Sequence, residues 1–527
     1  MENNIIVGKT PKPFEDGISK SLLDAMAKDP DFVAQINADT GERTTFGQMR
    51  ERTIRCALWL RKRGIVHEND VVAVSTPNQS DDYVPFFAAL YLGVVFNPWY
   101  HDLARDKAER FFELLEPKVM FACARSIDGL SRAARAVGSR CLFVCYERRP
   151  GYPCLRDALA EQRYEEVDDF RHLEPDAPEQ RAAVIFFSSG TTGEQKGIAI
   201  SYAAVPNHRF EYEYFEPAST VLWYSYLSWI TATSYLLLCV RTRSTRIVHG
   251  PADADETSRV VERYKVNYAF FTSPKLTQLC KAQALRRHDY SSLRRMMVGG
   301  SRCRGNTLQE VRRALPHCHV FVAYGTTEMS GVTTTQLRCS KIANSIGHVL
   351  PGVRAKIVDV ASGETLGPHR HGEICFDSEH KMLGYWKNPE KTRAVIDEEG
   401  WLHTEDFGFY DEDGEISVLG RIKEVMRLAD GRYASAGQIE DRLVRHPDVA
   451  EVAVIPTVKE NDVQLALAFV VAKPDAKATS EELRRVANSH DDTRQLLSVD
   501  VTFVDRLPCT PTGKKIIPAL IEMAREL

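Results

Sequence analysis

A run of hydroxyl, glycine and lysine residues at 188–197 is the clearest chemical feature of the sequence. It reads SSGTTGEQKG and lies between the apolar runs 184–187 and 198–200, which predict two strands joined by a loop. Glycine lets a backbone approach an anion closely, hydroxyls donate hydrogen bonds to phosphate oxygens, and lysine adds positive charge. We therefore predict a phosphate-binding loop. Its residues are Ser188, Ser189, Gly190, Thr191, Thr192, Gly193 and Lys196.

This loop has two other interpretations. The order Gln195-Lys196-Gly197 does not satisfy the GxxxxGK[ST] pattern, and a strand-like run follows it, which excludes an ordinary P-loop nucleotidase. A structural hairpin turn would explain the glycines, but it does not require four hydroxyls and a lysine in one loop. The hairpin turn stays open as the structural alternative.

The loop resembles the phosphate-binding signature of the adenylate-forming superfamily, which includes acyl-CoA synthetases, peptide-synthetase adenylation domains and beetle luciferases. The similarity runs almost end to end. TGERTTFGQ at 40–48 resembles an early family segment, and the chain from Arg421 to TPTGK at 510–514 resembles the family's mobile C-terminal domain. The resemblance implies activation of a carboxylic acid with ATP to an acyl-AMP, followed by transfer to a thiol. It also implies ATP, Mg²⁺ and coenzyme A as cofactors.

A second segment, YGTTE at 324–328, follows the apolar run 319–323. The resemblance implies that Tyr324 stacks on adenine, Thr327 contacts the α-phosphate and Glu328 meets Mg²⁺. These residue types suit those roles, because an aromatic face fits a base and a carboxylate fits a hard cation. A structural turn is the alternative. Four further residues are expected to line the nucleotide site: Gly325, Thr326, Gly300 and Ser301.

The segment WLHTEDFG at 401–408 resembles the family region whose aspartate holds the ribose hydroxyls. The resemblance implies that Asp406 and Arg421 bind ribose. Glu405 departs from the family, which usually has glycine there, and its side chain could crowd the turn or the sugar. An ordinary turn carboxylate is the alternative for Asp406.

The C-terminal loop PTGK at 511–514 resembles the family loop whose lysine enters the active site during adenylation. The resemblance implies that Lys514 binds the acid carboxylate and the α-phosphate, although a lysine in a glycine turn is otherwise a surface residue. It also implies that the small domain rotates about Lys423 and that Gly431 lines a tunnel for the thiol. Ala436 and Gln438 stand where the family has proline and glutamate. The predicted catalytic residues are Lys196, Thr327, Glu328 and Lys514.

These motifs need a large scaffold, and 527 residues are enough for several domains. Strand-like runs alternate with helical patterns, as in Val71–Val74 before a helix near Tyr83–Tyr91, which predicts parallel α/β units. After about Pro351 short strands with polar turns predict a small antiparallel module. The predicted fold class is α/β. A large N-terminal domain, residues 1–421, comprises two α/β subdomains and a small β-barrel-like module, and a small mobile α+β domain follows at 422–527.

Composition restricts the partners and the cellular location that we expect for the protein. Lys and Arg number 68 against 72 Asp and Glu, which lacks the basic excess of a nucleic-acid binder. Twelve cysteines without a CxxC pair predict free thiols. The apolar stretch 224–240 contains several hydroxyls and is expected to be buried rather than to span a membrane. We expect an intracellular protein, cytoplasmic or peroxisomal; its oligomeric state stays open.

The acid itself is not identified by any motif. The Phe-His gate of many acyl-CoA synthetases is replaced by YLSWI at 226–230, and Trp229 with Tyr226 and Tyr235 favours a fatty or aryl acid as the small-molecule partner. Three function classes remain: an acid–CoA ligase, a luciferase-like or carrier-loading adenylating enzyme, and a weakened ATP-binding relative. The cluster Arg241, Arg243 and Arg246 is expected to be a solvated face.

Overall fold

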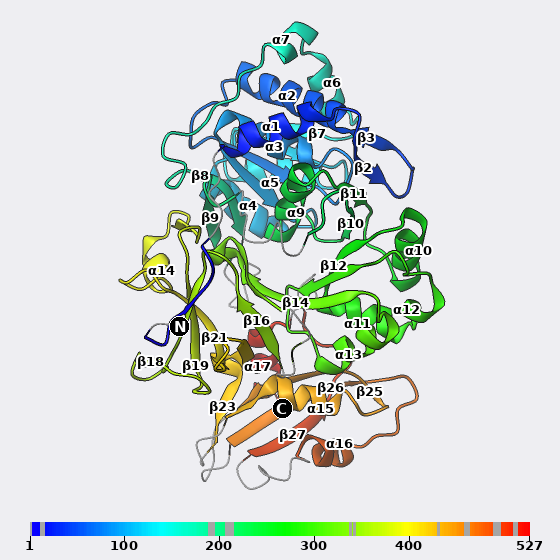
Figure 1. Cartoon of the computed structure of the whole chain (residues 1–527), viewed down its shortest axis with the longest axis vertical. Helices are drawn as coiled ribbons and strands as arrows, with labels where there is room; N and C mark the ends of the chain where they lie inside the picture. Colours follow the sequence, from blue (N-terminus) through cyan, green and yellow to red (C-terminus); the bar gives the residue numbers. More distant parts are fainter. Residues whose placement is uncertain are drawn as a thin grey trace.

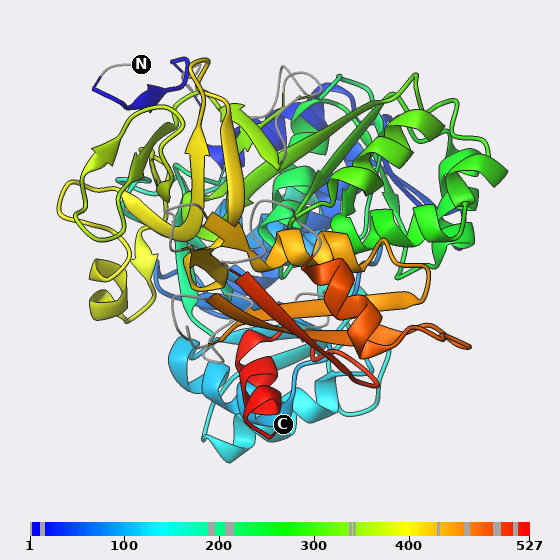
Figure 2. The same ribbon diagram turned by 90° about the horizontal axis from the view of Figure 1, so that it is seen from below.

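The computed structural model describes residues 3–10, 16–187, 195–205, 215–336, 340, 344–428, 433–457, 464–488, 497–509 and 515–526. Figure 1 shows an N-terminal α/β body at the top, a second sheet with its helices in the middle and a small C-terminal domain at the bottom. Seen from below in Figure 2, the small domain, orange and red, lies across the other two bodies. The predicted large N-terminal and small C-terminal parts are confirmed.

The first body is a seven-stranded sheet with the order β20-β9-β8-β5-β4-β6-β7. Helices cover both faces of its parallel strands, so strands such as Val71–Ser75 are buried throughout and read as continuous apolar runs. Helix α2 begins at a capping box in which Thr45 and Gln48 satisfy each other's backbone amides. The strands are β4 (Val71–Ser75), β5 (Val95–Trp99), β6 (Val119–Ala122), β7 (Leu142–Cys145), β8 (Ala182–Phe187), β9 (Gly197–Ser201) and β20 (Gly384–Tyr385). The helices are α1 (Ile18–Lys28), α2 (Phe46–Lys62), α3 (Tyr83–Leu92), α4 (Arg105–Leu115), α5 (Ile127–Ala136), α6 (Leu155–Ala160) and α7 (Tyr164–Asp168).

The second body is the parallel half of a 15-stranded sheet, in which β2, β11, β10, β12, β13 and β14 are neighbours in that order. Their carboxyl ends meet at one edge, where α/β proteins commonly bind ligands. The strands are β2 (Val33–Asn37), β3 (Arg43–Thr45), β10 (Thr220–Trp223), β11 (Thr245–Val248), β12 (Tyr268–Thr272), β13 (Arg295–Gly299) and β14 (His319–Thr326). The helices are α9 (Ile230–Arg241), α10 (Ala254–Tyr264), α11 (Ser273–Lys281), α12 (Ala284–Arg287), α13 (Gly305–Ala314) and the 3₁₀ turn η2 (Thr327–Met329).

The antiparallel module continues the same sheet in the order β14-β15-β16-β22-β21-β19-β17-β1. Its antiparallel character is as predicted, but its described strands do not close into a barrel, because they are joined edge to edge with the parallel half. The elements are β1 (Ile6–Val7), β15 (Gly331–Thr335), β16 (Ser345–Val349), β17 (Arg354–Val358), β18 (Thr365–Leu366), β19 (Gly372–Asp377), α14 (Pro389–Arg393), β21 (Leu402–Tyr410) and β22 (Ile416–Arg421).

The small domain has its own core, in which strand and helix residues such as Ile439, Val452 and Leu483 are buried together. It consists of a two-stranded hairpin and a three-stranded sheet flanked by helices. The elements are η3 (Ile422–Glu424), β23 (Val425–Arg427), β24 (Tyr433–Ser435), α15 (Ala436–Leu443), β25 (Val449–Pro456), β26 (Gln464–Ala472), α16 (Ser480–Ala487), β27 (Leu497–Phe503) and α17 (Ile517–Arg525).

The structure tests three expectations from the sequence about exposure, cysteines and the apolar stretch. The expectation of a solvated arginine face is wrong for Arg246, which is 4% exposed and donates two 2.7 Å hydrogen bonds to the buried Asp82 carboxylate, joining the first and second bodies. The cysteines within the described ranges are free thiols. Helix α9 buries most of the apolar stretch, and none of the helices described here is long and apolar enough to cross a membrane.

Candidate active site

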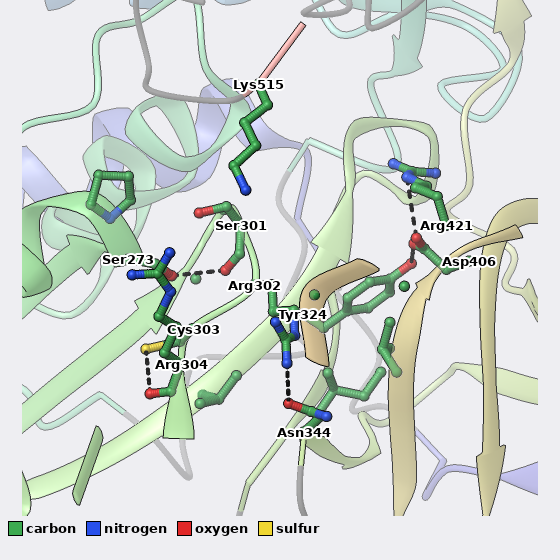
Figure 3. Close-up of a pocket in the computed structure, with 18 of the residues that line it drawn as sticks. Ser273, Ser301, Arg302, Cys303, Arg304, Tyr324, Asn344, Asp406, Arg421 and Lys515 are labelled. Atoms are coloured by element: carbon green, nitrogen blue, oxygen red, sulfur yellow. Dashed lines mark hydrogen bonds and ion pairs between the residues drawn. The ribbon is translucent and has the colours of Figure 1, made fainter. Parts of the chain in front are cut away.

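A cleft of about 3350 Å³ opens at the carboxyl ends of β13 and β14, between the second body, the antiparallel module and the small domain. Figure 3 shows part of its lining, with Tyr324 facing Asp406 and Lys515 entering from the small domain. Every predicted site residue that the structure describes lines this cleft. These residues are Lys196, Gly300, Ser301, Tyr324, Gly325, Thr326, Thr327, Glu328, Asp406 and Arg421.

Asp406, Tyr324, Arg421 and Thr404 form a polar cluster that we call the Asp406 corner. Strands β21 and β22 pair so that Asp406 lies opposite Arg421, and Arg421 Nε is 3.2 Å from Asp406 Oδ1. The Tyr324 hydroxyl donates a 2.5 Å hydrogen bond to the other carboxylate oxygen. The Asp406 side chain is only 10% exposed, so both contacts hold it in one orientation at the cleft wall.

Tyr324 remains a hydrogen-bond donor in this corner. Burial, and then the neighbouring Asp406 charge, raise the pKa of its phenol well above the ordinary value. Its ring lies beside Phe376, with the ring centroids 5.9 Å apart. The predicted adenine stacking by Tyr324 and the ribose roles of Asp406 and Arg421 stay predictions.

Glu405 has a left-handed backbone conformation, with a φ of 58°. A β-carbon is disfavoured at positive φ, so glycine would adopt this conformation at lower cost than glutamate. The Glu405 side chain is 61% exposed and its carboxylate lies 4.0 Å from the Lys423 ammonium. It therefore points to solvent and does not crowd Asp406.

The YGTTE segment forms a tight bend whose geometry requires Gly325. A β-carbon there would lie 2.1 Å from the Gly331 carbonyl oxygen across the β14–β15 pair. Thr326 caps the following 3₁₀ turn, accepting a hydrogen bond from the amide of Met329 at 3.2 Å. The bend presents Thr327 and Glu328 to the cleft.

Tyr385 connects two predicted catalytic residues and is not among the site residues that the sequence predicts. Its hydroxyl donates a 3.2 Å hydrogen bond to Glu328 Oε1, and the Lys196 ammonium lies 4.6 Å from the centre of its ring. Burial, followed by the Glu328 charge, raises the pKa of Tyr385. Strand β20 pairs with β9, so the tyrosine reaches the site through a long-range pairing that no local spacing could indicate.

The floor of the cleft is the loop that follows β13. Gly300 has a φ of 80°, and the carbonyl oxygen of Ser301 accepts a 2.8 Å hydrogen bond from the Ser273 hydroxyl. Arg302 then contacts the small domain, with its Nη2 2.7 Å from Asp441 Oδ2. The floor of the cleft is thus coupled directly to helix α15 of the small domain.

The small domain places Lys515 in the cleft, where its ammonium lies 2.5 Å from Glu440 Oε1. Lys514, predicted to be catalytic, is outside the described residues. The same holds for the loop residues Ser188, Ser189, Gly190, Thr191, Thr192 and Gly193, and for Gly431. The two strands predicted on either side of this loop are present as β8 and β9, and they pair antiparallel.

The remaining wall of the cleft is largely apolar. Helix α9, β13 and β15 contribute side chains that we call the apolar wall: Trp229, Ile230, Ser234, Tyr235, Leu238, Met297 and Val332. Tyr235 is 3% exposed, and its hydroxyl lies 3.2 Å from that of Tyr268, below the wall. Of the aromatic residues that the sequence favoured for acid binding, Trp229 and Tyr235 line the cleft and Tyr226 does not. The sequence did not indicate Ser234, Met297 or Val332.

The family of the chain follows from comparison with known proteins. The family model described as AMP-binding enzyme matches residues 22–386, and the model of the AMP-binding enzyme C-terminal domain matches residues 438–514. The chain therefore belongs to the AMP-binding enzymes, a family of adenylate-forming proteins.

Among individual relatives, the chain is similar to 4-coumarate–CoA ligase CCL1 of Humulus lupulus, with 27% identity over 91% of this chain and 88% of the relative. It is also similar to luciferin 4-monooxygenase of Nipponoluciola cruciata, with 26% identity over 98% of this chain and 96% of the relative. The crystal structure of ATP-bound MatB from Rhodopseudomonas palustris has the same fold, with a TM-score of 0.85 at 23% identity, covering 97% of this chain and 99% of that one.

Proposed function

We propose that this protein activates a carboxylic acid with ATP to form an acyl-AMP and then transfers the acyl group to coenzyme A. The Asp406 corner is the observation that carries the proposal. It offers a fixed carboxylate and a guanidinium next to an aromatic ring at the carboxyl edge of a parallel sheet. Such groups suit the hydroxyls and the base of a nucleoside.

In the first half-reaction an oxygen of the acid carboxylate attacks the α-phosphorus of ATP. A new bond forms between that oxygen and phosphorus, the bond to the β-phosphate breaks, and pyrophosphate leaves. Lys196 and the loop Ser188–Gly193 would hold the phosphates, Thr327 would contact the α-phosphate, and Lys514 would bind both reacting anions. Orientation and electrostatic stabilisation are then the main sources of rate.

Glu328 fits a magnesium ion, because its carboxylate lines the cleft and supplies the hard oxygen that Mg²⁺ prefers. The ion would neutralise phosphate charge. Tyr385 holds one oxygen of Glu328 by a hydrogen bond, which orients the carboxylate.

In the second half-reaction the thiol of coenzyme A attacks the acyl carbon. A thioester bond forms, the bond to AMP breaks and the thiol proton is lost. We propose a domain boundary between residues 421 and 422, with rotation of the small domain about Lys423 to replace Lys514 by the loop containing Gly431. In the described orientation the Arg302–Asp441 ion pair would have to open for this rotation.

We infer a fatty or aryl acid as the substrate. The apolar wall supports this, because it offers aromatic and aliphatic surface next to the floor at Gly300. The names of several relatives, which are 4-coumarate–CoA ligases, favour the aryl acid. The similarity to luciferin 4-monooxygenase over 98% of this chain keeps a luciferase-like second step as the alternative.

ATP–pyrophosphate exchange with a panel of fatty and aryl acids, followed by addition of coenzyme A, tests the proposal. Exchange and thioester formation with at least one acid are expected. Exchange without any thioester would favour the luciferase-like alternative. ATP binding without exchange would identify a binding-only relative.

Lys514→Ala should lower acyl-adenylate formation by about 10²-fold, the scale for loss of a transition-state charge contact, and should affect transfer from preformed acyl-AMP much less. Lys515→Ala is the matched comparison, since the neighbouring ammonium is paired with Glu440. A larger loss in Lys515→Ala than in Lys514→Ala would move the catalytic assignment to Lys515.

A further inference from the structure

The turn that carries Asp406 is strained and bulged. Strand β21 faces β19 with Phe407 opposite Glu373 and His403 opposite Cys375, so Thr404, Glu405 and Asp406 bulge out across Ile374. Glu405 lies in the left-handed region at the centre of this bulge. A non-glycine residue persists there only when surrounding contacts hold it.

Glu373 supplies such a contact. Its Oε1 accepts a 2.9 Å hydrogen bond from the backbone amide of Glu405, in place of a regular ladder hydrogen bond. The Glu373 side chain is 12% exposed, whereas the Glu405 residue that it holds is on the exposed side of the turn. Next to it, the Thr404 hydroxyl donates to the Ile374 carbonyl at 2.7 Å and accepts from the Asp406 amide at 3.0 Å.

His403 fixes the other oxygen of Glu373. Its Nδ1 is 2.8 Å from Glu373 Oε2, and its Nε2 is 3.4 Å from Asp397 Oδ2. Contacts of the ring with the Cys375 sulfur and the Glu373 carboxylate raise the pKa of His403 to about 11. The imidazolium then donates to two carboxylates at once.

Glu373, Cys375 and His403 also have the donor types of a metal site, with their ligand atoms within 4.8 Å of one another. The hydrogen bonds of the His403 ring to Glu373 and Asp397 account for the cluster without a metal ion. In addition, the Lys356 ammonium is 3.9 Å from Asp397 Oδ2 and would repel a metal cation.

We propose that Glu373, oriented by His403, is a positioning residue for Asp406: by holding the Glu405 amide it fixes the left-handed turn that directs the Asp406 carboxylate into the cleft. The inference rests on the proposed function, in which Asp406 binds ribose. Glu373 itself touches neither nucleotide nor acid.

The test is the affinity of the purified full-length protein for ATP and for 2′,3′-dideoxy-ATP, measured by calorimetry. Glu373→Ala should weaken ATP binding about tenfold and leave dideoxy-ATP binding nearly unchanged, since only the ribose hydroxyls lose their partner. Glu373→Gln keeps an oxygen that can accept from Glu405 and should recover most of the preference. Glu399→Ala is the matched control, because Glu399 contacts Lys356 on the same face but not the turn.

A second experiment tests whether Glu373 stabilises the left-handed backbone conformation of Glu405. In a Glu405→Gly background the turn no longer needs an external contact, so Glu373→Ala should cost less ATP affinity there than in the wild type. Equal losses for ATP and dideoxy-ATP, or an equal loss in both backgrounds, would overturn the inference and leave the proposed function intact. Wild-type protein that binds no ATP would overturn both. If the Ala variant folds poorly, the ratio of the affinities of the Gln variant for ATP and for dideoxy-ATP still tests the inference.

Discussion

The Asp406 corner and the apolar wall line one cleft and are held in different ways. In the corner, ion pairs and hydrogen bonds of 2.5–3.2 Å fix Asp406 between Tyr324 and Arg421, and Glu373 fixes the turn beneath it. On the wall, aliphatic side chains such as Ile230 and Leu238 are placed by the packing of α9 against the sheet, since they have no polar atoms that could form directional contacts. Specific polar contacts therefore fix the side chains on one side of the cleft, and the packing of apolar side chains fixes those on the other side.

This difference bears on function. Nucleotide recognition needs a few polar atoms at fixed positions, which tolerate little displacement. Acid recognition by an apolar surface depends on shape, and it changes gradually as side chains are exchanged. Variants in the corner should therefore alter ATP use without altering the choice of acid, and variants on the wall should do the reverse.

Asp406→Ala should give the largest effect. It removes the carboxylate proposed to bind ribose and takes from Arg421 its ion-pair partner, so kcat/KM for ATP should fall by about 10²-fold, near the upper range for hydrogen bonds to charged groups. The rank order of acids in pyrophosphate exchange should stay the same. Asp413→Ala, in the exposed turn of the same hairpin, is the control. An unchanged KM for ATP would show that the ribose assignment is wrong.

Ser234→Trp tests the opposite side. Ser234 lines the cleft from α9, and an indole there should fill part of the space for the acid. We expect kcat/KM for the largest accepted acid to fall by roughly 10- to 100-fold, while ATP affinity measured without acid stays within about twofold. Ser234→Ala, which changes little volume, should behave like the wild type. A matching loss of ATP affinity in the Trp variant would mean that the two sides are not separable.

The same contrast explains what the sequence could predict. YGTTE and WLHTEDFG were recognisable because each has a few polar residues at fixed local spacing, and the structure brings Tyr324, Asp406 and Arg421 together in the proposed nucleotide site. Alternating strands and helices also predicted the parallel sheets. Both kinds of prediction rest on local features of the sequence, since periodicity and turn residues act within a few positions of each other.

Contacts between distant segments were not predictable in this way. Tyr385 reaches Glu328 through the β9–β20 pair, and Glu373 reaches the Glu405 turn through β19. The described strands of the antiparallel module do not close into a barrel, because the edge strand of the module pairs with the parallel half of the sheet. The burial of Arg246 likewise depends on Asp82, which lies 164 residues earlier in the chain. Apart from Trp229 and Tyr235, the residues of the apolar wall have no signal in the sequence, so they could be identified only from the structure.

Tyr324→Phe should have a smaller effect than Asp406→Ala, because Arg421 would still hold Asp406. Loss of the phenolic donor is expected to weaken ATP binding by roughly tenfold at most. Since the pKa of Tyr324 is raised by burial, the donor is present throughout the usual assay range, and this difference should not depend on pH between about 6 and 9. Tyr324→Leu removes the ring as well as the hydroxyl, so a comparison of the Leu and Phe variants isolates the contribution of the ring. If the ring stacks on adenine, the Leu variant should bind ATP more weakly than Phe; equal affinities would refute stacking.

Glu405→Gly should give the smallest change, and it tests whether strain in the Asp406 corner is real. Glycine adopts the φ of 58° without a β-carbon, so the free energy of unfolding should rise by up to about 1 kcal/mol, with activity kept or improved. The substitution also removes the Lys423 contact, but at 4.0 Å between side chains that are 78% and 61% exposed, that contact contributes little. Glu405→Ala removes the same carboxylate and keeps the β-carbon, which makes it the matched control. Urea unfolding should therefore place Gly above the wild type and Ala at or below it. If Gly and Ala shift the midpoint equally, the effect comes from the lost charge, and the left-handed turn would cost the fold nothing measurable.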